Sequence, residues 1–113
     1  HVDLMWQQRS AYIFLGLPYD IIMYGLLLEL IAKGAGLKPG KLIGSLGDCH
    51  LYNNHLEQAK LQLSRKMKPL PKLNLNAGIT ISNDNLIIPT HKDIKISGYN
   101  PDPSIKADLS VGT

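Results

Sequence analysis

Two short stretches of this sequence carry side chains that could bind a polar ligand. His50 and Tyr52 stand two residues apart in GDCHLYNNH, so on a strand both would point to one face, about 7 Å apart. An imidazole nitrogen and a phenol that converge could clamp a hydroxyl group, and the alternative is a half-buried polar pair. Arg9 and Ser10 end an expected strand, where guanidinium and hydroxyl could hold a phosphate, although most arginines are only surface charges.

Cys49 and His55 are the candidates for nucleophilic or metal chemistry. Neighbours on a strand face opposite ways, so a couple between Cys49 and His50 is not expected, and Cys49 is expected to be a small core residue. No acidic or cysteine ligand stands at a fitting distance from the two histidines, so we expect no metal site. A single cysteine excludes an internal disulfide and suits a reducing, cytoplasmic location.

Asp20 is the one carboxylate in the otherwise apolar stretch GLPYDIIMYG. The plain interpretation is that Asp20 is the N-cap of the helix that follows, where it would accept backbone N–H bonds and complement the helix dipole. The alternative is that its carboxylate faces a ligand. The pattern alone favours the cap.

The elements that would position these residues begin with a strand and a long helix. Val2, Leu4 and Trp6 alternate with less apolar residues, which predicts a strand with one buried face. A helix is expected over 20–33, apolar nearly all round and therefore central in the core. Two glycines, Gly34 and Gly36, are expected to end it.

The rest of the chain predicts shorter elements. A turn is expected at Pro39-Gly40, followed by a strand and then by a second helix with Asn53 or Asn54 as N-cap. Further strands are expected within 72–76, 78–82 and 93–99. The predicted fold class is α/β (α+β), with a mixed sheet packed on a long buried helix.

Composition limits the classes of protein. The chain has 113 residues, 44% of them hydrophobic, which is typical of a globular protein and too many for a disordered one. The formal charge of +3 is small and scattered, so nucleic acid is not expected as a partner. The run IIMYGLLLELIA is too short to span a bilayer, and no membrane association is expected. The chain starts without a secretory leader or an initiating methionine, which suggests a fragment or a processed chain.

Four stretches together resemble one family: QRSAYIFLGLPYDI, GDCHLYNNHLEQAKLQLSR, PLPKL and GYNPDPSIKA. They have the order and spacing found in thymidylate synthase, and the chain resembles the C-terminal portion of that family, which includes the deoxycytidylate hydroxymethylases. The resemblance implies that 1–113 is the C-terminal part of a single domain with a thymidylate-synthase-like fold. It also implies an obligate homodimer in which each subunit lends arginines to the phosphate site of the other.

The resemblance assigns roles to the residues singled out above. The positions of Arg9 and Ser10 bind the 5′-phosphate of the nucleotide in the family, and those of His50 and Tyr52 bind the 3′-hydroxyl of the deoxyribose. The ribose assignment agrees with the same-face spacing of the second pair. The expected substrate is a pyrimidine deoxynucleoside monophosphate.

The family reaction transfers a one-carbon unit from 5,10-methylenetetrahydrofolate, a co-substrate, to carbon 5 of the pyrimidine. Leu15 and Gly16 match positions near the folate. A cysteine thiolate first adds to carbon 6 and makes carbon 5 nucleophilic. That cysteine lies upstream of the motif that contains Arg9, and Cys49 matches another position. The chain alone is therefore expected to be inactive.

Asp20 differs from the synthases, which have an asparagine here against the pyrimidine edge, and agrees with the hydroxymethylases, which have aspartate. An amide can match both the N–H and the carbonyl of uracil, whereas a carboxylate accepts from the amino group of cytosine. An unpaired buried acceptor costs roughly 1–3 kcal/mol, enough for at least a tenfold preference. Asp20 therefore favours dCMP and hydroxymethyl transfer, with methylation of dUMP as the alternative.

Tyr12 is the second departure, because the family usually has an aspartate there that contacts the pterin ring. Tyr12 could offer its backbone N–H to the base but not a carboxylate. The tail 106–113 also differs from the short apolar ending of the family, so the details of folate binding stay open. A third possibility, from another class, is a non-catalytic fragment that acts through dimerisation.

Overall fold

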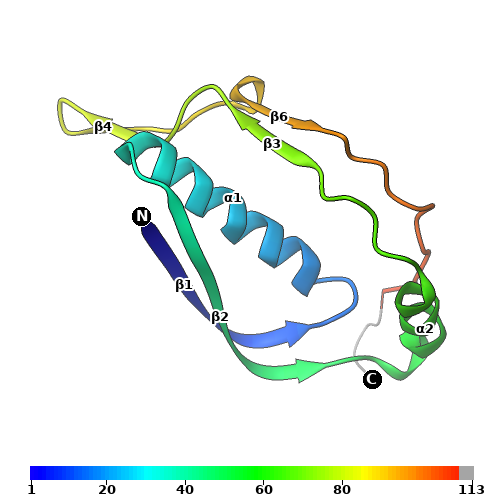
Figure 1. Cartoon of the computed structure of the whole chain (residues 1–113). Helices are drawn as coiled ribbons and strands as arrows, with labels where there is room; N and C mark the ends of the chain where they lie inside the picture. Colours follow the sequence, from blue (N-terminus) through cyan, green and yellow to red (C-terminus); the bar gives the residue numbers. More distant parts are fainter. Residues whose placement is uncertain (110–113) are drawn as a thin grey trace.

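The first half of the chain is a strand–helix–strand unit (Figure 1). The structure, a computed structural model, describes residues 1–109; the last four residues of the expected altered tail, 110–113, lie outside the described residues. Strand β1 (Val2–Tyr12) leads into helix α1 (Leu17–Ala35), which returns the chain to strand β2 (Pro39–His50). The two strands pair in parallel, which requires such a crossover helix.

The inner face of β1 packs on α1, as its alternating pattern predicts. Trp6 is buried, whereas its neighbour Met5 is 61% exposed. The indole of Trp6 stacks on the ring of Tyr24 in α1, with ring centroids 4.9 Å apart and planes 18° apart. This aromatic contact fixes the helix against the strand.

Helix α1 begins three residues earlier than its apolar run suggests. Gly16 is the N-cap and Pro18 lies in the first turn, where a missing N–H costs nothing. The expectation that Asp20 is the N-cap is wrong, because Asp20 is already inside the first turn. At the other end Gly36 is the C-cap, with a left-handed φ of 68°, and Gly34 is the last residue but one of the helix.

The expectation of a turn at Pro39-Gly40 is also wrong, because both residues belong to β2. The chain reverses earlier, after Gly36, where the backbone N–H of Leu37 donates to the carbonyl of Ala32 at 2.9 Å. Glycine at the C-cap therefore makes the reversal without a proline turn.

The second half of the chain consists of short elements: η1 (Asn53–His55), α2 (Leu56–Ser64), β3 (Lys72–Leu75), β4 (Thr80–Ser82), β5 (Asn85–Ile87), η2 (His91–Asp93) and β6 (Ile94–Ser97). Strands β3 and β6 pair antiparallel, and β4 and β5 form a hairpin. Strand β5 was not expected; Asn83 and Asp84, both with positive φ, make the tight turn before it. The α/β fold class is confirmed, and within residues 1–109 the strands are divided among three two-stranded sheets instead of one mixed sheet.

Helix α2 differs from its sequence pattern in two respects. Its N-cap is His55, and the two expected capping residues, Asn53 and Asn54, lie in the preceding 3-10 turn. Leu63 is 86% exposed, so the apolar side of α2 is not part of the core of the described residues.

The burial of α1 is confined to one part of its surface. Leu28, Leu30 and Ala32 are buried, whereas Ile22 and Met23 near the N-terminal end are exposed. The helix lies between the β1–β2 pair and the β3–β6 pair (Figure 1). Within residues 1–109 no helix is both long enough and apolar enough to cross a membrane.

Candidate functional site at the ends of two parallel strands

The polar residues singled out from the sequence gather where β1 and β2 end. Ser10 pairs with Asp48 and Tyr12 with His50 in the parallel register, so the two motifs lie side by side. The backbone N–H of Gly16 donates to the carbonyl of Tyr12 at 3.2 Å, which brings the start of α1 to the same place. The carboxyl ends of parallel strands are where open α/β folds bind ligands.

His50 and Tyr52 converge as expected. Tyr52 lies beyond the end of β2 and not within it, yet its ring centroid is 5.3 Å from that of His50, with planes 61° apart. The ring of Tyr12 stacks on His50 at 5.7 Å and lies 4.5 Å from the ring of Tyr52. The three rings therefore form one aromatic cluster at the strand ends.

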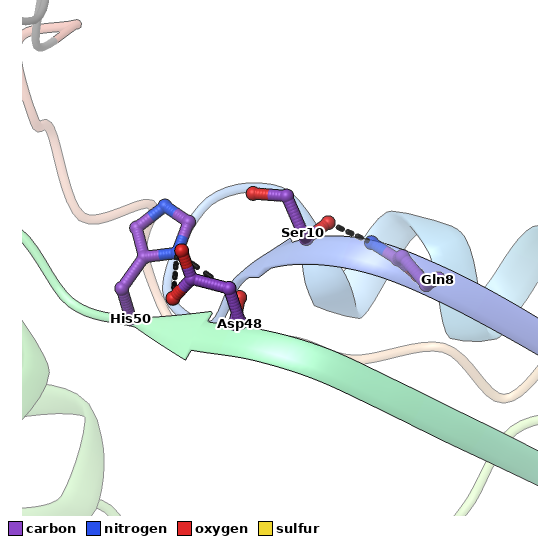
Figure 2. Close-up of polar contacts among 4 residues, drawn as sticks. All are labelled: Gln8, Ser10, Asp48 and His50. Carbon is purple, nitrogen blue, oxygen red and sulfur yellow. Dashed lines mark hydrogen bonds and ion pairs between the residues drawn. The ribbon is translucent and has the colours of Figure 1, made fainter.

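The imidazole of His50 is oriented by its own strand (Figure 2). Nδ1 lies 3.2 Å from the backbone carbonyl of Asp48 and 3.5 Å from a carboxylate oxygen of the same residue. Both neighbours are acceptors, so Nδ1 carries the proton and donates. With this tautomer Nε2 is an acceptor that has no partner among residues 1–109, which suits a ligand hydroxyl.

Tyr12 and the buried His55 extend this cluster toward the C-terminal segment. The hydroxyl of Tyr12 hydrogen-bonds to Nδ1 of His55, a residue with no solvent exposure. Nε2 of His55 donates to the carbonyl of Asp108 at 2.6 Å. Partial burial is the main cause that raises the pKa of the Tyr12 phenol above its ordinary value, and the neighbouring Tyr52 is the second cause. Tyr12 is therefore a neutral donor to His55.

Asp20 projects from the first turn of α1 toward β1. Its Oδ2 accepts a hydrogen bond of 2.8 Å from the side-chain amide of Gln8. The same amide nitrogen donates to the carbonyl of Ser10 at 3.0 Å (Figure 2), and its oxygen accepts from the indole N–H of Trp6 at 3.1 Å. Sequence reasoning missed Gln8, although its inward position, two residues after Trp6, could have indicated it.

Arg9 and Ser10 are adjacent in the sequence, but their side chains do not share one face of β1. They are successive residues within β1, which continues to Tyr12, so their side chains leave opposite faces of the strand. Both are exposed, and no side chain among residues 1–109 forms an ion pair with Arg9. Any shared anion would have to reach them around the strand edge.

Leu15 and Gly16 lie in the turn between β1 and α1. A Cβ on Gly16 would come within 3.3 Å of the carbonyl of Tyr12, closer than an ordinary contact. The turn therefore favours glycine for a steric reason, whatever else it contacts.

Cys49 is exposed, so the expectation of a small core residue is wrong. It follows Asp48 on β2 and leaves the strand on the face opposite His50. Within the part of the chain that the structure describes, no three histidine, cysteine or acidic side chains are grouped as metal ligands.

A strand–helix–strand unit with polar side chains at the carboxyl ends of its parallel strands is the arrangement in which open α/β folds bind ligands. A sequence model of one family, described as thymidylate synthase, matches residues 1–111. A curated relative, "Thymidylate synthase" from Listeria monocytogenes serovar 1/2a, is 53% identical over 104 residues, which make up 92% of this chain and 32% of that protein. The chain belongs to the thymidylate synthase family, and it spans about a third of the length of the relative that it matches.

Proposed function

We propose that this chain carries the nucleotide-reading part of a thymidylate synthase family enzyme. In the complete enzyme a one-carbon unit passes from 5,10-methylenetetrahydrofolate to carbon 5 of a pyrimidine deoxynucleoside monophosphate. The substrate that we favour is dCMP, as in a hydroxymethylase. The family match supports the class of reaction, and Asp20 supports the choice of base.

The observation that carries the choice of base is the state of the Asp20 carboxylate. It is not used as a helix cap, and one of its oxygens is already held by Gln8. Asp20 is half-buried, so a ligand there would exclude part of the water around it. A carboxylate in that position accepts from the amino group of cytosine and repels the carbonyl of uracil.

His50 and Tyr52 are the residues that we assign to the 3′-hydroxyl of the deoxyribose. The free Nε2 of His50 would accept the hydroxyl proton, and the phenol of Tyr52 would complete the clamp. Arg9 and Ser10 would bind the phosphate from the edge of β1, and Tyr12 would lie beside the sugar and the base.

The nucleophile and most of the folate site are assigned to polypeptide outside these 113 residues. Cys49 leaves the strand away from His50, so it is not placed to attack a pyrimidine held by that histidine. Leu15 and Gly16 would contribute to the folate site from the β1–α1 turn. We therefore regard 1–113 as the C-terminal part of one catalytic domain, and we expect the chain alone to form no product.

A second candidate is methylation of dUMP. The observation that favours it is the 53% identity with the thymidylate synthase of Listeria monocytogenes. In that case Asp20 would be a tolerated variant, with its contact to Gln8 mainly structural.

A homodimer is supported by the outer face of the β1–β2 pair. Met5 and Ile43 are register partners on that face, and they are 61% and 42% exposed. Arg9 leaves β1 on the same side, so a second copy seated there would meet a cation as well as apolar surface. Sedimentation velocity of the chain and of Met5→Lys would test this, because a charge in the interface should favour the monomer.

The experiment that tests the choice of base is competitive binding of dCMP and dUMP to the chain and to Asp20→Asn. Trp6, the single tryptophan, lies one hydrogen bond from Gln8 and gives a fluorescence readout. We expect dCMP to bind at least about tenfold more tightly, and the order to reverse in the variant. Tighter binding of dUMP by the unchanged chain would support the second candidate instead.

A further inference from the structure

Among residues 1–109, Gln8 is the one residue whose side chain joins Asp20 by a hydrogen bond to the buried part of the sheet. Its amide has three partners: Nε2 donates to Asp20 at 2.8 Å and to the Ser10 carbonyl at 3.0 Å, and Oε1 accepts from Trp6 at 3.1 Å. Both protons of the amide nitrogen are thereby used. The side chain therefore has a single satisfied orientation.

Trp6 determines that orientation. Turning the amide over would place Oε1 against the Asp20 carboxylate and the Ser10 carbonyl, and the amino group against the indole N–H. All three contacts would become repulsive. Trp6 cannot move away easily, because it is only 9% exposed and stacks on Tyr24.

We propose that Gln8 is a positioning residue that determines base specificity through residue 20. Because Gln8 presents only a donor to that position, it binds one oxygen and leaves one atom free for the base. With aspartate the free atom is an oxygen, which accepts from the amino group of cytosine. With asparagine the oxygen must face Gln8, so the free atom is an amino nitrogen, which donates to the carbonyl of uracil.

This inference rests on the proposed function, since it requires that residue 20 face the pyrimidine. It goes beyond that function in assigning selectivity to a pair. Asparagine alone could rotate and present either its oxygen or its amino group, and Gln8 removes that freedom, whereas the two oxygens of aspartate are equivalent. A merely structural role, tying β1 to α1, would leave the ratio of the two nucleotide affinities unchanged.

The test is a double-mutant cycle on the full chain with Gln8→Met, Asp20→Asn and the double variant. Methionine keeps the length of the side chain and removes both donors. The dissociation constants of dCMP and of dUMP are measured for each protein by calorimetric titration. The matched control is Gln7→Met, because Gln7 is exposed on the other face of β1 and its side chain forms no hydrogen bond within residues 1–109.

We expect Asp20→Asn to change the ratio of the two dissociation constants at least about tenfold, both in the otherwise unchanged chain and in the Gln7→Met control. In the Gln8→Met background the same substitution should change the ratio by a clearly smaller factor, because aspartate still presents an oxygen but the amide of asparagine can then turn either way. Equal changes in both backgrounds would overturn the role of Gln8 and leave the proposed function intact. Failure of both nucleotides to bind would overturn the proposed function and the specificity role with it.

A ligand-independent measurement tests the geometry itself. The side-chain amide protons of Gln8 should shift in a nitrogen–proton NMR spectrum when Asp20→Ala or Trp6→Phe removes a partner, and those of Gln7 should not. Unmoved Gln8 resonances would contradict the hydrogen-bond arrangement and overturn the inference, whatever the nucleotides do.

Discussion

The phenol of Tyr12 donates a hydrogen bond to Nδ1 of His55, a ring with no exposed surface. Nε2 of the same ring donates to the carbonyl of Asp108. The buried imidazole is therefore satisfied at both nitrogens by residues 43 and 53 positions away in the sequence. Tyr12 thus links the strand ends to the C-terminal segment.

Removal of the Tyr12 hydroxyl should destabilise the chain. In Tyr12→Phe, Nδ1 of His55 loses its partner inside a site from which water is excluded, and an unsatisfied buried acceptor costs about 1–3 kcal/mol. Equilibrium unfolding in urea measures the change. Tyr52→Phe is the control, because within residues 1–109 the Tyr52 hydroxyl forms no hydrogen bond to a buried side chain. Equal losses in both variants would contradict the role assigned to His55.

The stability of the chain should fall in alkaline solution through the same residue. The pKa of Tyr12 is raised in the folded state above 10.0, first by partial burial and then by Tyr52, so the unfolded chain loses this proton first. The stabilisation is present below the ordinary pKa and is lost as the pH rises through the folded one. Unfolding measured from neutral pH upward should show this loss, and Tyr12→Phe should lack it. A pH dependence identical in both proteins would assign it to other tyrosines.

The assignment of Tyr52 to the ribose can be tested with the ligand as the control. Tyr52→Phe should weaken binding of the preferred deoxynucleotide about tenfold, the value of one well-placed hydrogen bond of about 1.4 kcal/mol. Binding of the matching 2′,3′-dideoxynucleotide, which lacks the 3′-hydroxyl, should not change between the two proteins. An equal loss for both ligands would mean that Tyr52 acts through the fold and not through the sugar.

The segment before the C-terminus is held by a second contact that depends on pH. Nζ of Lys68 lies 2.9 Å from Oδ1 of Asp102, and this hydrogen bond is the main reason that the pKa of Asp102 is lowered from 3.8. Its contribution is present above the ordinary pKa and is lost as the pH falls through the folded one. A carbon NMR titration of the Asp102 carboxyl should show the lowered pKa, and Lys68→Met should return it toward 3.8. An unchanged midpoint in Lys68→Met would exclude this contact as the cause.

The order of the elements could be predicted from the sequence, because period-two and helical patterns depend on neighbouring residues. The parallel pairing then follows from topology, since a strand, a helix and a strand pack most simply as one crossover unit. The exposure of Cys49 could not be predicted, because it depends on which face of β2 is covered by α1. The missed strand β5 is three residues long, too short for an alternating pattern to indicate it.

The parts of the candidate site that depend on spacing along the chain could be predicted from the sequence, and the parts that depend on tertiary contacts could not. His50 and Tyr52 converge because two positions on or near a strand share a side. The bond from Gln8 to Asp20 joins residues on two different elements, so no local pattern contains it. Asp20 resembled an N-cap because it is a polar residue at the start of an apolar run, but Gly16 and Pro18 start the helix earlier.

The close approach of α1 to the β3–β4 loop offers a matched pair of glycine substitutions. A Cβ on Gly34 would overlap the backbone carbonyl of Ile79. The backbone N–H of Ile79 donates to the carbonyl of Leu30 in α1 at 2.9 Å. A Cβ on Gly25, in the same helix, would meet only a methyl group of Leu42 at 3.7 Å, an ordinary contact. Comparing alanine at the two positions therefore separates the effect of helix propensity on stability from the effect of the steric overlap.

Gly34→Ala should destabilise the chain by about 1–3 kcal/mol, because the loop must move away from the helix and the bond between Ile79 and Leu30 is strained. Gly25→Ala should be neutral or should stabilise it by up to about 1 kcal/mol, since alanine is the better helix former. Urea unfolding measures both, and hydrogen exchange at the amide of Ile79 should accelerate only in Gly34→Ala. A stabilising Gly34→Ala would mean that the loop does not dock on the helix at this point.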